Sequence, residues 1–186
     1  MNKMIVIPDT SFFVCFIDDL ADFVPENDRY QYLNVISTVY QITVTPEVRK
    51  ETSWNRVPEI IQTQCYYAEN ILSPPTVDPI IEQLRLLLGK GEIDVISYSN
   101  MYKREKIDDF KFVLDDGMAR KLVSENLPIL VTHMVGTVGL LKICALEKIY
   151  DKVSIINILE NIKVSKFRIQ DDMVCKIIIE IKESGG

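Results

Sequence analysis

Short apolar runs alternate along the chain with segments in which apolar residues recur every three or four positions. The runs are typical of buried parallel strands, and the recurring pattern is typical of helices that pack on a sheet. We predict strands at Met4–Ile7, Ile42–Thr45, Phe110–Leu114 and Pro128–Val131. Strands that alternate with helices imply an α/β fold, in which a mostly parallel central sheet is flanked by helices on both faces.

The predicted helices follow from the same pattern and from local start signals. Pro46 opens one of them, at the position in the first turn that proline prefers. Residues 58–88 also look helical, with breaks at Ser73–Pro75 and near Pro79. The other predicted helices cover Ser11–Leu20, Asp28–Tyr40, Gly89–Lys103, Met118–Val123, Gly136–Ile149, Ser154–Ile162 and Asp171–Glu183.

Length and composition narrow the class of protein. A chain of 186 residues is expected to form one domain, spanning 1–186, with a proper core. The four cysteines form no CxxC pair and lie among apolar residues, which indicates reduced thiols in a cytosolic protein. The single histidine, His133, excludes a histidine-rich metal site.

No segment of the sequence resembles a membrane span or a signal peptide. The longest uncharged apolar stretch, Leu127–Leu141, is shorter than the roughly 20 residues that a bilayer requires. Asp9 interrupts the apolar N-terminus, and no small-residue cleavage site follows. We therefore expect a cytoplasmic protein.

The net charge of -6 is unevenly distributed. Residues 1–100 hold 14 acids and 7 bases, whereas residues 101–186 hold 13 acids and 14 bases. The bases of the second part are either an ordinary solvated surface or phosphate contacts. Those that we consider as phosphate contacts are Lys103, Arg104, Lys106, Lys111, Arg120, Lys121, Lys163, Lys166 and Arg168. An acidic isoelectric point does not exclude a nuclease that works through bound cations.

Acidic residues stand where strands and helices of the predicted fold meet. Asp9 follows the first strand, Asp115 and Asp116 follow a later one, and Glu92 lies in the first turn of the helix between them. The carboxyl ends of parallel strands face one edge of a sheet, where ligands bind. Each acid also has a structural interpretation, since Asp9 and Asp115 suit helix caps and Glu92 suits a helix dipole.

Clustered carboxylates without cysteine or histidine ligands favour hard cations, Mg²⁺ or Mn²⁺. Two such ions can activate water and stabilise the leaving oxygen when a phosphodiester is hydrolysed. Thr10 and Ser11 are placed to bond the metal ligands or the scissile phosphate. The turn at Gly136–Thr137 opens a helix whose backbone N–H groups suit a phosphate.

Several short motifs occur in an order that resembles PIN domains, with the closest likeness to the prokaryotic branch related to VapC-type toxin ribonucleases. The likeness spans almost the whole chain. Its motifs are Val6-Ile7-Pro8-Asp9-Thr10-Ser11, Thr45-Pro46-Glu47-Val48, Gly89-Lys90-Gly91-Glu92, Leu114-Asp115-Asp116-Gly117-Met118-Ala119-Arg120, Gly136-Thr137-Val138-Gly139-Leu140-Leu141 and Phe167-Arg168-Ile169.

The resemblance implies a Mg²⁺- or Mn²⁺-dependent endoribonuclease that hydrolyses RNA, and the toxin of a toxin–antitoxin pair is one role that it suggests. It assigns the catalytic acids to Asp9, Glu92 and Asp116, and adds Asp115 beside them as a metal ligand. It also implies a helical insertion at about 53–88, an antitoxin protein as partner, and pairing into a homodimer. Thr10, Ser11, Arg120, Gly136 and Thr137 are the expected substrate contacts.

The chain departs from the family pattern at two places. Leu114 stands where a threonine or serine is usual, and Gly117 and Met118 stand where a fourth acid often occurs. These departures motivate the alternative of a weakly active or inactive PIN-fold module that binds RNA or a protein partner. An aspartyl-phosphate phosphatase fits less well, because Ser11 stands where that mechanism needs a second aspartate.

Overall fold

The computed structural model describes residues 3–52, 54–71 and 78–184. Its centre is a five-stranded sheet with the strand order β3-β2-β1-β4-β5, in which every strand pair of the described residues is parallel. The strands are β1 (Ile5–Ile7), β2 (Gln41–Val44), β3 (Tyr66–Tyr67), β4 (Phe110–Val113) and β5 (Met134–Val135). The prediction of an α/β fold with a parallel sheet is confirmed.

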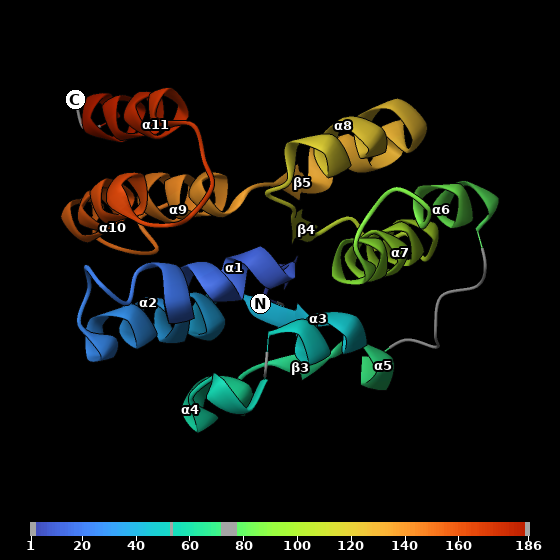
Figure 1. Ribbon diagram of the computed structural model, residues 1–186, viewed down its shortest axis with the longest axis horizontal. Helices are drawn as coiled ribbons and strands as arrows, with labels where there is room; N and C mark the ends of the chain where they lie inside the picture. Colours follow the sequence, from blue (N-terminus) through green and yellow to red (C-terminus); the bar gives the residue numbers. More distant parts are fainter. Residues whose placement is uncertain (1–2, 53, 72–77, 185–186) are drawn as a thin grey trace.

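Helices cover the sheet, with α2, α9, α10 and α11 to one side of the strands and α6, α7 and α8 to the other (Figure 1). Short π- or 3-10-helical turns occur at Cys15–Asp19, Trp54–Arg56 and Pro128–His133. The α-helices are α1 (Thr10–Val14), α2 (Glu26–Val39), α3 (Pro46–Glu51), α4 (Glu59–Gln62), α5 (Ala68–Ile71), α6 (Pro79–Leu84), α7 (Lys90–Arg104), α8 (Gly117–Asn126), α9 (Thr137–Leu146), α10 (Lys152–Val164) and α11 (Asp171–Glu183).

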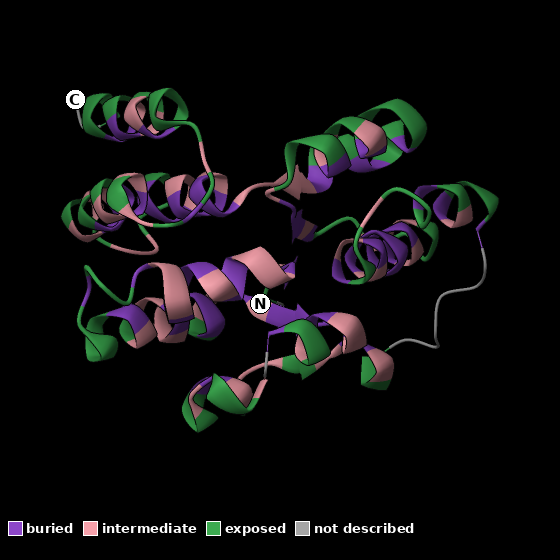
Figure 2. Ribbon diagram, viewed as in Figure 1, coloured by how far each residue is buried: buried purple, intermediate pink, exposed green. Residues whose placement is uncertain are grey.

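The core runs along the central strands, which are buried on both faces (Figure 2). Val6 and Ile7 of β1 and Phe112 and Val113 of β4 are fully enclosed, as the continuous apolar runs predict for parallel strands between helices. None of the helices in the described part of the chain is long and apolar enough to cross a membrane.

One predicted strand is wrong. Pro128–Val131 belongs to a 3-10 helix over Pro128–His133, and the strand β5 follows it at Met134–Val135. Only Leu130 and His133 of the helical segment are buried, which is the spacing of three that a 3-10 helix places on one side. Pro128 favours this outcome because its fixed φ suits a helix start and it has no N–H for a sheet.

The helical prediction for residues 58–88 does not hold at Tyr66–Tyr67. These two residues form β3, which pairs with Thr43 and Val44 at the edge of the sheet. Tertiary pairing with β2 overrides a local pattern that has no strand period. The predicted break near Pro79 is confirmed as the start of α6, whereas the break at Ser73–Pro75 lies outside the described residues.

A buried arginine holds together the turn that follows the first helix. The guanidinium of Arg29, on α2, donates to the backbone carbonyls of Phe16 and Ile17 in the π-helical turn Cys15–Asp19. Arg29 is 8% exposed, so these carbonyls have a charged donor in place of water. The contact ties the segment after Asp9 to α2.

We expect Arg29→Met to lower the free energy of unfolding by about 2 kcal/mol, because hydrogen bonds from a charged donor to buried carbonyls are lost. Urea denaturation monitored by circular dichroism measures the change. The control is Arg85→Met, since Arg85 makes an exposed pair with Glu82 and its loss should cost less than about 0.5 kcal/mol. Equal losses in the two variants would contradict the role given to Arg29.

Candidate active site

Two aspartates from distant parts of the chain meet where the central strands end. Ile7 of β1 pairs in parallel with Phe112 of β4. If this pairing register is extended by two residues in each strand, Asp9 lies beside Leu114. Asp115 follows, and its backbone N–H donates to Asp9 Oδ2 over 3.3 Å. We call Asp9 and Asp115 the inner pair; they lie at the carboxyl edge of the sheet, where open α/β folds place their ligands.

The hydroxyl of Ser11 bridges the inner pair. Ser11 Oγ lies 2.7 Å from Asp9 Oδ1 and 2.7 Å from Asp115 Oδ2. A hydroxyl has a single proton to donate, so both contacts are satisfied together only when one of the carboxyl groups is protonated. Burial, followed by the negative charge of Asp115, raises the pKa of Asp9 to about 7. Burial therefore favours the protonated form of Asp9.

Asp115 is held from its other side by the start of α9. The backbone N–H of Thr137 donates to Asp115 Oδ1 over 2.7 Å, and the Thr137 hydroxyl donates to Oδ2 over 2.6 Å. Gly136 permits this approach, because a Cβ atom at that position would lie 3.0 Å from Asp115 Oδ1. The start of α9 thus fixes the orientation of the Asp115 carboxylate.

The neighbouring acid, Asp116, has a different local role. Its Oδ1 accepts from the backbone N–H of Ala119 over 2.7 Å, so Asp116 is the N-cap of α8. The interpretation of Asp115 as a helix N-cap is therefore wrong, because Asp115 points at Asp9 and Thr137. Asp116 is exposed at the rim of the site.

Glu51, at the end of α3, is an acid near the site that the sequence-based assignment of site residues omitted. Its Oε1 accepts from the Gly91 N–H over 3.0 Å, and its Oε2 accepts from the Thr10 hydroxyl over 2.6 Å. A Cβ atom on Gly91 would collide with the Glu51 carboxylate, so a larger residue there would displace that carboxylate. The signal in the sequence is the position of Glu51 on a helix that Pro46 opens directly after β2.

Glu92 lies with Glu51 and Asp116 in what we call the outer group. The Glu92 carboxylate accepts from the Gly89 N–H over 2.8 Å and closes the first turn of α7. Burial raises the pKa of Glu92, the Gly89 N–H lowers it, and the charges of Asp116 and Glu51 raise it. Within residues 3–52, 54–71 and 78–184, no three His, Cys, Asp or Glu side chains are placed to hold one metal ion.

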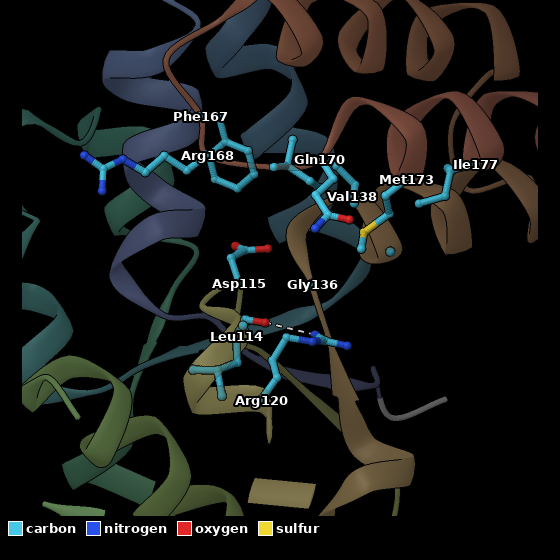
Figure 3. A pocket seen from close by; sticks show the side chains of 13 residues that line it. Leu114, Asp115, Arg120, Gly136, Val138, Phe167, Arg168, Gln170, Met173 and Ile177 are labelled. Carbon is cyan, nitrogen blue, oxygen red and sulfur yellow. Dashed lines mark hydrogen bonds between the residues drawn. The ribbon is translucent and has the colours of Figure 1, made fainter. Parts of the chain in front are cut away.

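The residues predicted to contact substrate lie around these acids, and three of them, Thr10, Ser11 and Thr137, hydrogen-bond to the acids. Thr10 donates to Glu51, Ser11 contacts the inner pair, and both donors of Thr137 are directed at Asp115. Arg120 extends from α8, where its Nη1 donates to the Leu114 carbonyl over 2.9 Å (Figure 3). These hydrogen bonds orient the carboxylates and the Leu114 backbone next to them.

Two cavities adjoin Asp115, and Phe167 and Arg168 line both of them. The first, which we call the Gln170 cavity, has a volume of about 420 Å³ and lies among the starts of α8, α9 and α11 (Figure 3). The second, the Lys166 cavity, has a volume of about 510 Å³ and is lined by polar and charged residues. Those residues are Ser11, Asp19, Asp115, Asp116, Lys166 and Arg168.

Comparison with known proteins identifies the family of the chain. A family model described as a PIN domain matches residues 28–183. The chain belongs to the PIN domain family, whose members are generally nucleases and typically use divalent metal ions. No curated protein and no solved structure matches the chain at a significant level.

The raised pKa of Asp9 makes stability depend on pH. The folded protein keeps a proton on Asp9 that the unfolded chain releases, so stability is full below the unfolded pKa of 3.8 and falls as pH rises towards about 7. In metal-free buffer we expect a loss of up to about 4 kcal/mol between pH 4 and pH 8. Asp9→Asn should flatten this profile, as measured by urea denaturation across the pH range.

The matched control for this pH profile is Asp109→Asn, which alters an exposed aspartate. It should leave the decline with pH unchanged. If Asp9→Asn declines as steeply as the unmodified protein, the proton assigned to Asp9 lies elsewhere.

Proposed function

We propose that the protein is a metal-dependent endoribonuclease that hydrolyses RNA phosphodiesters with Mg²⁺ or Mn²⁺. The observation that carries the proposal is the inner pair at the carboxyl edge of a PIN-family sheet. Asp9 is buried and the neighbouring Asp115 is half-buried, so a cation bound between their carboxyl groups would favour the ionised form of both. Members of the family supply the precedent for a nucleic acid substrate.

The donor chemistry of the inner pair fits a hard cation. Mg²⁺ is commonly held by one or two carboxylates, with water and substrate phosphate completing its shell. Asp9 and Asp115 provide two carboxylates, and the outer group of Glu51, Glu92 and Asp116 adds negative charge nearby. When bound, such an ion supplies a Lewis acid and lowers the pKa of a bound water.

The residues of the chain orient the acids and handle the proton. Asp9 and Asp115 would hold the cation with both carboxyl groups ionised, and the Ser11 hydroxyl would donate to one of the two carboxylates. Thr137 keeps the Asp115 carboxylate in place through two hydrogen bonds. The Lys166 cavity, with Lys166 and Arg168 beside the acids, receives the phosphate backbone.

The deciding experiment incubates the purified protein with a mixed pool of RNA in the presence of Mg²⁺, Mn²⁺ or a chelator. We expect cleavage only with a divalent ion, and we expect Asp9→Asn to abolish it. Equal cleavage by Asp9→Asn and the unmodified protein, or cleavage in the chelator, would show that the proposed chemistry is wrong.

The two adjacent aspartates should differ in their effects on cleavage. Asp115→Asn removes a charge from the inner pair, so we expect kcat/KM to fall by at least about 100-fold, more than for the loss of a residue that only supports a metal ligand. Asp116→Asn keeps an N-cap, since asparagine caps as well as aspartate. Its kcat/KM should stay within about tenfold of the unmodified protein, and a larger loss would place Asp116 at the metal.

A second candidate function follows from the small number of grouped ligands. No three acids of the described residues are placed around one ion, which suits a weakly active or inactive module that binds RNA or a protein. Isothermal titration with Mn²⁺ separates the two. Heat of binding that disappears in Asp115→Asn supports the nuclease, whereas RNA binding without any metal binding or cleavage supports the module.

The proposal extends to a toxin restrained by an antitoxin protein, and this extension rests on the family resemblance. Expression in a bacterial host should then arrest growth for the unmodified chain and not for Asp9→Asn. Growth that is equal for both chains would argue against the toxin.

A further inference from the structure

The Gln170 cavity has walls that differ from those of the neighbouring Lys166 cavity. Leu114 and Val138 close its inner side and are almost fully buried. Met173 and Ile177, four residues apart on α11, line it from the other side. The volume of about 420 Å³ lies in the range of about 300–1,000 Å³ that small-molecule sites occupy.

An aromatic ring lies beside Asp115 at this cavity. Phe167 is 8% exposed and lines both cavities. Figure 3 shows its ring beside the Asp115 carboxylate, whereas the Arg168 side chain extends away from the interior of the Gln170 cavity. The cavity therefore offers an apolar wall and an aromatic surface within reach of the inner pair.

A few polar groups face the same space. The Gln170 side chain turns into the cavity (Figure 3), and its amide offers an N–H donor and a carbonyl acceptor. Arg120 lies at the opposite wall, held by its bond to the Leu114 carbonyl. One amide with both kinds of hydrogen-bonding group can pair with the edge of a nucleobase.

We propose that the Gln170 cavity binds one nucleobase of the RNA, next to the phosphate that is cleaved. This inference rests on the proposed function. The apolar walls and Phe167 take the flat faces of the base, and the Gln170 amide bonds its edge. Unstacked bases of single-stranded RNA are recognised in this way, by stacking on aromatic side chains and by hydrogen bonds to their edges. The cavity therefore selects the base at one position of the cleavage site.

The first test measures nucleotide binding without catalysis. The four ribonucleoside 5′-monophosphates are titrated in chelator and followed by saturation-transfer NMR, which shows whether base protons contact the protein. We expect one base to bind best, and Met173→Trp, which fills the cavity, to weaken binding by at least about tenfold. The matched control is Ile179→Trp, on another face of α11 and 53% exposed, which should bind as the unmodified protein does.

The second test concerns selection among bases. Gln170→Leu keeps the shape of the side chain and removes its amide, so we expect the preference among the four nucleotides to fall by about tenfold. Sequencing of RNA ends produced by the unmodified protein should show the preferred base beside the cut. The same sequencing for Gln170→Leu should show a relaxed preference at the position beside the cut.

The outcomes separate this inference from the proposed function. In one outcome, nucleotide binding depends on the base and is lost in Met173→Trp, but the protein cleaves no RNA. This result would support the nucleobase site and contradict the nuclease. In another outcome, the protein cleaves RNA without base preference and Met173→Trp binds nucleotides as the unmodified protein does. This result would contradict the nucleobase site and support the nuclease. Absence of binding for all four nucleotides also rejects it, and points to a protein segment as the occupant.

Discussion

The parallel pairing of β1 with β4 positions the central acids of the candidate site. The pairing of Ile7 with Phe112 sets Asp9 level with the end of the neighbouring strand, where the Asp115 N–H reaches it. A slip of one residue would turn the side chains of a strand to its other face. Since β1 and β4 are enclosed on both faces, such a slip would also disrupt the core, and so the packing of the strands protects the geometry of the acids.

Burial of the Asp9 carboxyl group next to the half-buried Asp115 carboxylate is unfavourable, and the surroundings offset part of that cost. Ser11 lies between them and Thr137 donates twice to Asp115. The raised pKa of Asp9 shows that repulsion and desolvation persist. A nearby positive charge would offset the repulsion and favour the ionised form of Asp9.

Much of this arrangement is predictable from the sequence, and the errors have identifiable causes. Asp9 is recognisable as an acid that follows an apolar run, and the two aspartates after Phe110–Leu114 are recognisable in the same way. Either Asp115 or Asp116 could cap α8. The direction of the backbone at the end of β4 decides between them, and packing sets that direction. The pairing of Glu51 with Gly91 joins residues 40 positions apart, and no local pattern reports such a contact.

The sequence by itself determined the alternation of strands and helices, the parallel sheet and the family, because hydrophobic period and short motifs are local properties. The tertiary structure decided which acids form the inner pair, placed Glu51 beside Thr10, and made Pro128–His133 a 3-10 helix and Tyr66–Tyr67 a strand. It also formed the Gln170 cavity from α8, α9 and α11. These features depend on contacts between distant segments, whose energies exceed local preference only once the core has assembled.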